Sequence, residues 1–155
     1  MNEVNYANRV GQAIYAKRVP LWDPDTGKLT DFSTHFSFLI DTQGMNTYGH
    51  GLAFFLAPVG FKILTNSAGG YVGLFNTSTY DSAQNQIVLV ELDFFANSEW
   101  DPPVEHVGIN NNTIASAVYT PWNASLHSGD TADVWIIYNS STKSFECLLE
   151  IPNNL

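Results

Sequence analysis

Apolar residues recur along this chain in short runs rather than in long helical stretches. The runs alternate with polar residues or are continuous, and clusters of Gly, Pro, Asn, Asp and Ser separate them, as is typical of strands joined by turns. They predict strands at residues 32–40, 52–56, 71–75, 87–95, 113–119, 132–138 and 145–151. Because no stretch has the period of a long helix, the pattern predicts an all-β sandwich or jelly roll.

The composition fits one compact domain spanning residues 1–155 and excludes some partners. The chain is 45% hydrophobic and 14% aromatic, enough to build a core at this length. Its net charge of −9, with only six Lys and Arg residues, argues against a nucleic-acid partner and against an anionic membrane surface. The single cysteine, Cys147, excludes an internal disulfide, and its place in an alternating run indicates packing.

Two carboxylates lie inside an apolar run, at Glu91 and Asp93. Residues two apart in a strand share a face, so these side chains point the same way. Burying two like charges together costs roughly several kcal/mol unless they are paired, protonated or bound to metal. A solvated acidic turn is the plainer alternative, but it does not explain acidic residues in a strand that is hydrophobic on both faces. The sequence therefore predicts a metal site.

The segment after this run supplies further ligands from a predicted turn, and the ligand types indicate two ions. Calcium binds six to eight oxygens, including amide and backbone carbonyl oxygens. It suits Asp93, the Phe95 carbonyl, Asn97 and Asp101. A transition ion such as manganese accepts carboxylate and imidazole together. It suits Glu91, Asp93, Asp101 and His106, with Asp93 and Asp101 bridging both ions.

The order Glu-x-Asp, Asn, Trp-Asp-Pro and His-x-Gly-Ile in residues 91–109 resembles the metal-binding segment of legume lectins. Further likenesses lie at residues 14–17, 21–23, 31–38, 51–58 and 69–75. The chain is most similar to the lectin-like ectodomains of plant receptor kinases, through Gly-His-Gly-Leu-Ala-Phe-Phe at 49–55 and the Asn run at 110–112. The resemblance is clearest over residues 10–145. It implies a concanavalin-A-like β-sandwich that binds carbohydrate, depends on Ca²⁺ and Mn²⁺, and has no catalytic activity.

The resemblance also implies a sugar site and one more metal contact. Gly70, Asn97 and Phe95 match the family's backbone donor, calcium-bound amide and stacking ring, and Ser116 matches a residue that contacts the transition ion through water. His50 stands where the family has Asp. Neutral imidazole offers one acceptor where a carboxylate accepts from two hydroxyls, and charge-assisted hydrogen bonds are about twice as strong as neutral ones. The substitution therefore predicts weaker monosaccharide binding, and three alternatives stay open: a different glycan, an apolar ligand, or a protein-interaction module without sugar binding.

An enzyme is a further alternative, because some glycoside hydrolases of jelly-roll fold also carry Glu-x-Asp on a strand. Those enzymes need a separate acid, which their pattern supplies two or three residues later. Phe95 and Ala96 occupy these positions, and no Ser lies in a Gly-x-Ser-x-Gly context. The sequence therefore predicts a binding protein rather than an enzyme.

Four sequons, at Asn76, Asn111, Asn123 and Asn139, fit a secreted glycoprotein or a plasma-membrane ectodomain. Residues 1–5 do not read as a signal peptide, and no run is long enough to span a membrane. The resemblance implies that the family's first strand and its closing strands are missing. Unpaired strand edges favour aggregation, so we expect a marginally stable chain or a homo-oligomer. A monomeric, sharply cooperative melt above about 60 °C would contradict this expectation.

Overall fold

The structure is a computed structural model and describes residues 9–152; the expectation for residues 1–5 lies outside them. The described part contains seven strands and three short 3₁₀ helices, so the all-β prediction is confirmed. It divides into two compact units, one built from residues 9–14 and 46–123 and the other from residues 15–45 and 124–152. No helix in residues 9–152 is long and apolar enough to cross a membrane.

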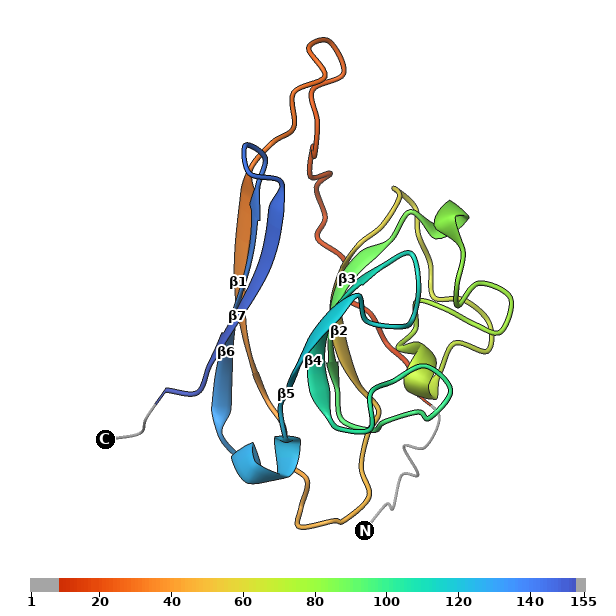
Figure 1. Cartoon of the computed structure of the whole chain (residues 1–155), viewed down its shortest axis with the longest axis vertical. Helices are drawn as coiled ribbons and strands as arrows, with labels where there is room; N and C mark the ends of the chain where they lie inside the picture. The colour runs from red at the N-terminus through yellow and green to blue at the C-terminus, as the bar shows by residue number, and fades with distance from the viewer. Residues whose placement is uncertain (1–8, 153–155) are drawn as a thin grey trace. The chain divides into compact units, whose positions relative to one another are not determined.

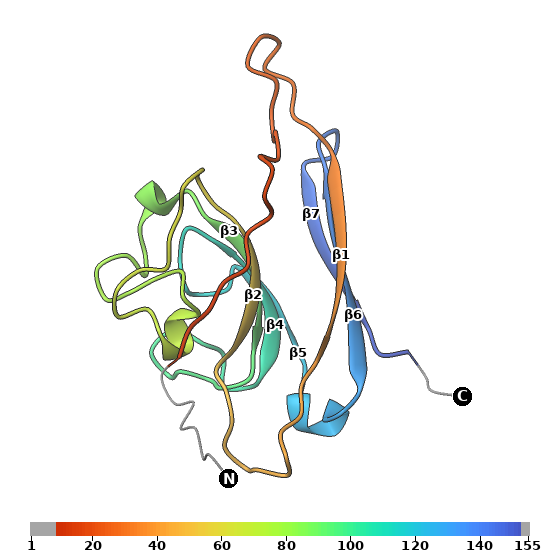
Figure 2. The ribbon, with the colours of Figure 1, turned by 180° about the vertical axis from the view of Figure 1, so that it is seen from behind.

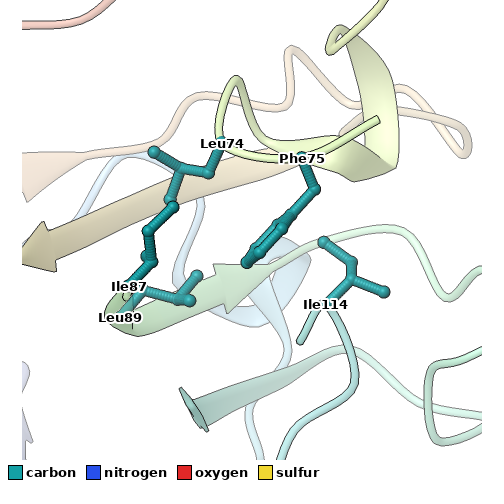
Figure 3. Close-up of a cluster of buried hydrophobic side chains, with 5 residues drawn as sticks. All are labelled: Leu74, Phe75, Ile87, Leu89 and Ile114. Carbon is teal, nitrogen blue, oxygen red and sulfur yellow. The ribbon is translucent and has the colours of Figure 1, made fainter. Parts of the chain in front are cut away.

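The first unit contains a four-stranded antiparallel sheet in the order β2-β3-β4-β5 (Figure 1). Its strands are β2 (Gly51–Leu56), β3 (Val88–Asp93), β4 (His106–Asn111) and β5 (Val118–Pro121). The 3₁₀ helices η1 (Gly69–Tyr71) and η2 (Ala83–Asn85) lie in the long connection between β2 and β3. This connection helps to build the unit's hydrophobic core, shown in Figure 3, from Leu74, Phe75, Ile87, Leu89 and Ile114.

The second unit contains a three-stranded antiparallel sheet in the order β1-β6-β7, seen from behind in Figure 2. Its strands are β1 (Phe32–Leu39), β6 (Thr131–Asn139) and β7 (Ser144–Glu150), and η3 (Ala124–His127) precedes β6. Burial alternates along β1, as expected for a strand with one covered face. Cys147 is half-buried and shares a face of β7 with Phe145 and Leu149, which agrees with a packing role.

Five of the predicted strands are confirmed as β1, β2, β3, β6 and β7. The strand predicted at 71–75 is wrong, because Val72 and Gly73 have φ of 46° and 79° and the segment forms the end of η1 and a turn. Only Val118 and Tyr119 of the strand predicted at 113–119 lie in β5. His106, assigned from the sequence to a turn, instead begins β4. Pro102 and Pro103 lie just before β4, and proline is rare inside strands, so the sequence in this region indicated a turn.

Candidate metal centre and ligand site

Glu91 and Asp93 occupy the inner strand β3, and each is only 1% exposed. The register sets Glu91 opposite Gly108 and Asp93 opposite His106 on β4. Glu91 Oε1 accepts a hydrogen bond from Ser116 Oγ at 2.6 Å, and Asp93 Oδ1 accepts one from the Phe95 N–H at 2.7 Å. The two carboxylates are therefore buried on one face of the sheet and held by neutral donors.

Asp101 and His106 join Glu91 in a group whose candidate ligand atoms all lie within 4.8 Å of one another. Nε2 of His106 is 3.4 Å from Oε1 of Glu91, and its Nδ1 is 3.2 Å from the Val104 carbonyl oxygen. In the neutral imidazole, a hydrogen on Nδ1 would donate to that carbonyl and leave the Nε2 lone pair available to a metal ion. The Val104 carbonyl is thus placed to favour the tautomer that a metal-ligating histidine requires.

The pKa values of this group are raised because several carboxylates lie close together away from solvent. Burial raises the pKa of Asp93 to about 7, and the nearby carboxylates of Asp101 and Glu91 add to the increase. Burial also raises the pKa of Asp101, with Glu91 again contributing. Burial by itself lowers the pKa of His106, but the hydrogen bond to Glu91 and the charges of Glu91 and Asp93 outweigh it, so the pKa is raised. Without a cation, the group therefore retains protons.

Two buried oxygens of this group have no hydrogen-bond partner in the structure: Asn97 Oδ1 and Asp101 Oδ1. Such groups are rare, because leaving a buried acceptor unpaired costs about 1–3 kcal/mol. The other oxygen of Asp101 accepts from the Asn97 N–H at 2.7 Å, so the two residues are linked. Hard oxygens of this kind are calcium ligands, whereas the group with His106 suits a transition ion. The donor set thus fits both expected ions.

The four residues predicted to contact sugar lie beside one another and beside this group. The rings of His50 and Phe95 are 4.9 Å apart, and Phe95 is 39% exposed. Gly70 is buried so closely against Asn97 that a Cβ on it would lie 2.9 Å from Asn97 Cγ. Nδ1 of His50 is buried without a hydrogen-bond partner, and the Gly49–His50 peptide bond is cis. An exposed ring and polar atoms without partners make a surface suited to a hydroxylated ligand.

Sequence reasoning missed two residues that the structure places against Glu91. Asn110 is fully buried and donates from Nδ2 to Glu91 Oε1 at 2.9 Å. Gly108 is the register partner of Glu91, and a Cβ there would lie 3.0 Å from Glu91 Oε1. The sequence did hold a signal for Asn110: from His106 to Asn110, every second residue is Val or Ile, which is the alternation of a strand and sets Asn110 on the same face as His106.

The predicted sequons differ in their surroundings. Asn111, Asn123 and Asn139 are exposed. Asn76 is half-buried, and its Nδ2 donates to the Thr65 carbonyl oxygen at 3.2 Å. The four sites are therefore not equivalent acceptors for a glycan.

Comparison with known proteins adds independent information. The chain matches the legume lectin domain over residues 1–154. It is 49% identical to L-type lectin-domain containing receptor kinase IX.1 of Arabidopsis thaliana, over 93% of this chain and 23% of that protein. It is 42% identical to seed agglutinin 2 of Robinia pseudoacacia, over 99% of this chain and 52% of that protein.

A solved structure, lectin UEA-II complexed with galactose, matches with a TM-score of 0.81 and 38% identity, covering 90% of this chain and 59% of that one. The chain thus spans about a quarter of the receptor kinase and about half of the seed agglutinin. The predicted sandwich fold class is confirmed by this similarity to legume lectin structures. Because the family matches almost the entire sequence, the chain belongs to the legume lectin domain family.

Proposed function

We propose that this chain is a carbohydrate-binding lectin domain whose sugar site is organised by calcium and by a transition ion such as manganese. The observation that carries the proposal is the buried group of Glu91, Asp93, Asp101 and His106, next to the partnerless oxygens of Asn97 and Asp101. The legume lectin family is non-catalytic, so the chain is not an enzyme. We further propose that residues 1–155 belong to one such domain.

The residues divide between the two ions by their chemistry. Glu91, Asp93, Asp101 and His106 would hold the transition ion, with Ser116 reaching it through water. Asp93, the Phe95 carbonyl, Asn97 and Asp101 would hold calcium. When bound, the ions supply positive charge that offsets the buried carboxylates and fixes the loop carrying Asn97.

The ligand surface formed by His50, Gly70, Phe95 and Asn97 would then contact the sugar. If Asn97 Oδ1 serves calcium, Nδ2 is left to donate to a sugar hydroxyl. The exposed face of Phe95 suits the C–H side of a pyranose, and the backbone N–H of Gly70 is a second donor. A matched lectin structure contains galactose, which supports a hexose as the first ligand to try.

The direct test is calorimetric titration of metal-stripped protein with Ca²⁺ and Mn²⁺. We expect two ions to bind, and we expect Asp93→Ala and Asp101→Ala to lose both and His106→Ala to lose the transition ion. Asp133→Ala is the matched control, because Asp133 is a carboxylate of the other unit, bonded to Ser37 and His35. Absence of metal binding by a demonstrably folded wild-type chain would refute the proposal; two-ion binding justifies a glycan screen.

One residue favours a second candidate function, a module that keeps the fold and binds protein instead of sugar. His50 stands where the family resemblance expects a carboxylate. If this histidine weakens a sugar site, His50→Asp should raise affinity for monosaccharides in the metal-loaded protein. An unchanged affinity, with the fold and both ions retained, would argue for the protein-binding module.

The similarity to the receptor kinase supports a further proposal on location. We propose that the parent protein presents this domain outside the cell, as a secreted lectin or as the ectodomain of a receptor. The four sequons are consistent with passage through the secretory pathway. Homo-oligomerisation stays a prediction, and analytical ultracentrifugation of the metal-loaded chain tests it.

A further inference from the structure

Asn110 lies at the centre of a buried hydrogen-bond network beside the candidate transition-ion site. It is 0% exposed on β4, opposite Leu89 of β3. Nδ2 donates to Glu91 Oε1 at 2.9 Å and to the Ile114 carbonyl oxygen at 2.6 Å. Oδ1 lies 3.2 Å from the hydroxyl oxygen of Ser116. One side chain thus joins a carboxylate on β3, a serine and the backbone that leads toward β5.

The hydrogen bonds fix the orientation of this amide. The NH₂ group has two hydrogens, and the two atoms facing it, Glu91 Oε1 and the Ile114 carbonyl oxygen, only accept. Rotating the amide by 180° would place Oδ1 against both acceptors, so that neither would receive a hydrogen bond from Asn110 and Glu91 Oε1 would keep only the donor Ser116 Oγ. Asn110 therefore has one satisfied orientation, and in that orientation it always donates to Glu91.

The consequence for Glu91 is a carboxylate held in place from two sides. Ser116 Oγ donates to the same oxygen, Oε1, at 2.6 Å, and His106 Nε2 lies 3.4 Å from it. A free glutamate side chain loses up to about 2 kcal/mol of rotamer entropy when it is fixed. Donors already in place when the ion arrives remove most of that cost from metal binding. Partners of this kind change metal affinity by about 10- to 100-fold when they are mutated.

We propose that Asn110 is a positioning residue for the metal centre and does not itself bind the ion. It orients Glu91, and it also orients Ser116, which would contact the ion through water. This inference rests on the proposed function, because it requires that the group around Glu91 hold a transition ion. Asn110 lies outside the expected set of metal ligands. The inference gives its amide a role in the affinity for the transition ion as well as in folding.

The test compares Asn110→Leu, which keeps the number and branching of the side-chain heavy atoms but removes the amide, with Asn85→Ala. Asn85 is a suitable control because its Nδ2 likewise donates to two oxygens, here the carbonyl oxygens of Thr79 and Asn112, neither of which belongs to a candidate ligand. Free Mn²⁺ is followed by electron paramagnetic resonance during titration of metal-stripped protein, and thermal melts of the same samples report stability. We expect Asn110→Leu to weaken Mn²⁺ binding by about 10- to 100-fold, and Asn85→Ala to lower the melting temperature without changing Mn²⁺ affinity.

Unchanged Mn²⁺ affinity in folded Asn110→Leu would overturn the inference and leave Asn110 a purely structural residue. If wild-type protein itself binds no Mn²⁺, the proposed function fails instead, so the two failures are distinguishable. Should Asn110→Leu not fold, exchange of the Asn110 side-chain amide protons is measured by NMR in wild-type protein loaded with diamagnetic Zn²⁺. Protons that exchange as fast as those of exposed Asn111 would refute the role, and slow exchange that persists in the loaded state would support it.

Discussion

The metal-stripped chain should become less stable as the pH rises from about 5 to about 7. Burial raises the pKa of Asp93 to about 7 from an ordinary 3.8, so between these values the folded chain holds a proton that the unfolded chain has released. The free energy of unfolding then falls by about 1.4 kcal/mol per pH unit for each extra proton held. The raised pKa values of Asp101 and His106 act with the same sign.

The opposite trend comes from carboxylates whose pKa is lowered. Hydrogen bonds from Ser140 and from Ser37 lower the pKa values of Asp31 and Asp133, respectively. Their contribution to stability is lost only as the pH falls toward and below their ordinary value of 3.8. It therefore does not compensate for the loss between pH 5 and 7.

The assay is urea unfolding of chelator-treated protein at half-unit intervals of pH, with Asp93→Asn and Asp133→Asn as a matched pair. We expect wild type and Asp133→Asn to lose stability across the window, and Asp93→Asn to have a flatter profile. Saturating Ca²⁺ and Mn²⁺ should reverse the trend, because metal binding requires deprotonated carboxylates and strengthens as the pH rises. Stability of the stripped wild type that increases from pH 5 to 7 would refute the reasoning.

Three further predictions follow from close approaches and exposure. Gly108→Ala places a Cβ against Ser116 Oγ and 3.0 Å from Glu91 Oε1, so Mn²⁺ affinity should fall at least tenfold, as for other changes beside a metal ligand; unchanged calorimetric affinity would contradict this. Gly70→Ala places a Cβ 2.9 Å from Asn97 Cγ and should abolish sugar binding on a glycan array, while Gly11→Ala, whose Cβ meets no atom within 4 Å and whose φ is not positive, should not. When the chain is secreted from a eukaryotic cell, we expect Ser141→Ala to lose one glycan by mass spectrometry and Ser78→Ala to lose none, because Asn139 is exposed and Asn76 is half-buried; equal losses would contradict it.

Sequence reasoning performed best where the side chains themselves carry the pattern. Apolar periodicity predicted most strands, and the conflict between Glu91 and its apolar neighbours identified a buried acidic group, which the structure contains. The family resemblance supplied the candidate sugar contacts, and the structure brings them together. Their role as a sugar site, like that of the two ions, stays a prediction.

What the sequence did not predict depends on contacts between distant segments. The apolar run at 71–75 resembled a strand, but left-handed backbone at Val72 turns it into the core instead. Gly108 and Asn110 differ little from ordinary strand residues, and only the β3–β4 pairing sets Gly108 opposite Glu91 and brings the Asn110 side chain within a hydrogen bond of Glu91. Pairing register is a tertiary property, because it is set by which faces become buried.

The position of the acidic group along the chain has a consequence for the chain's topology. Glu91 lies two residues before the end of β3, Asp101 lies in the connection that follows, and His106 begins β4. An ion held by all three would cross-link the two ends of that connection. A disulfide does this in other proteins, but this chain has only one cysteine. Because these ligands are dispersed in the unfolded chain, the ion binds the folded chain preferentially, and the free energy of that binding adds to the free energy of unfolding. Bound metal would then stabilise the connection between β3 and β4 reversibly. A chelator would remove this stabilisation, whereas a reducing agent would not.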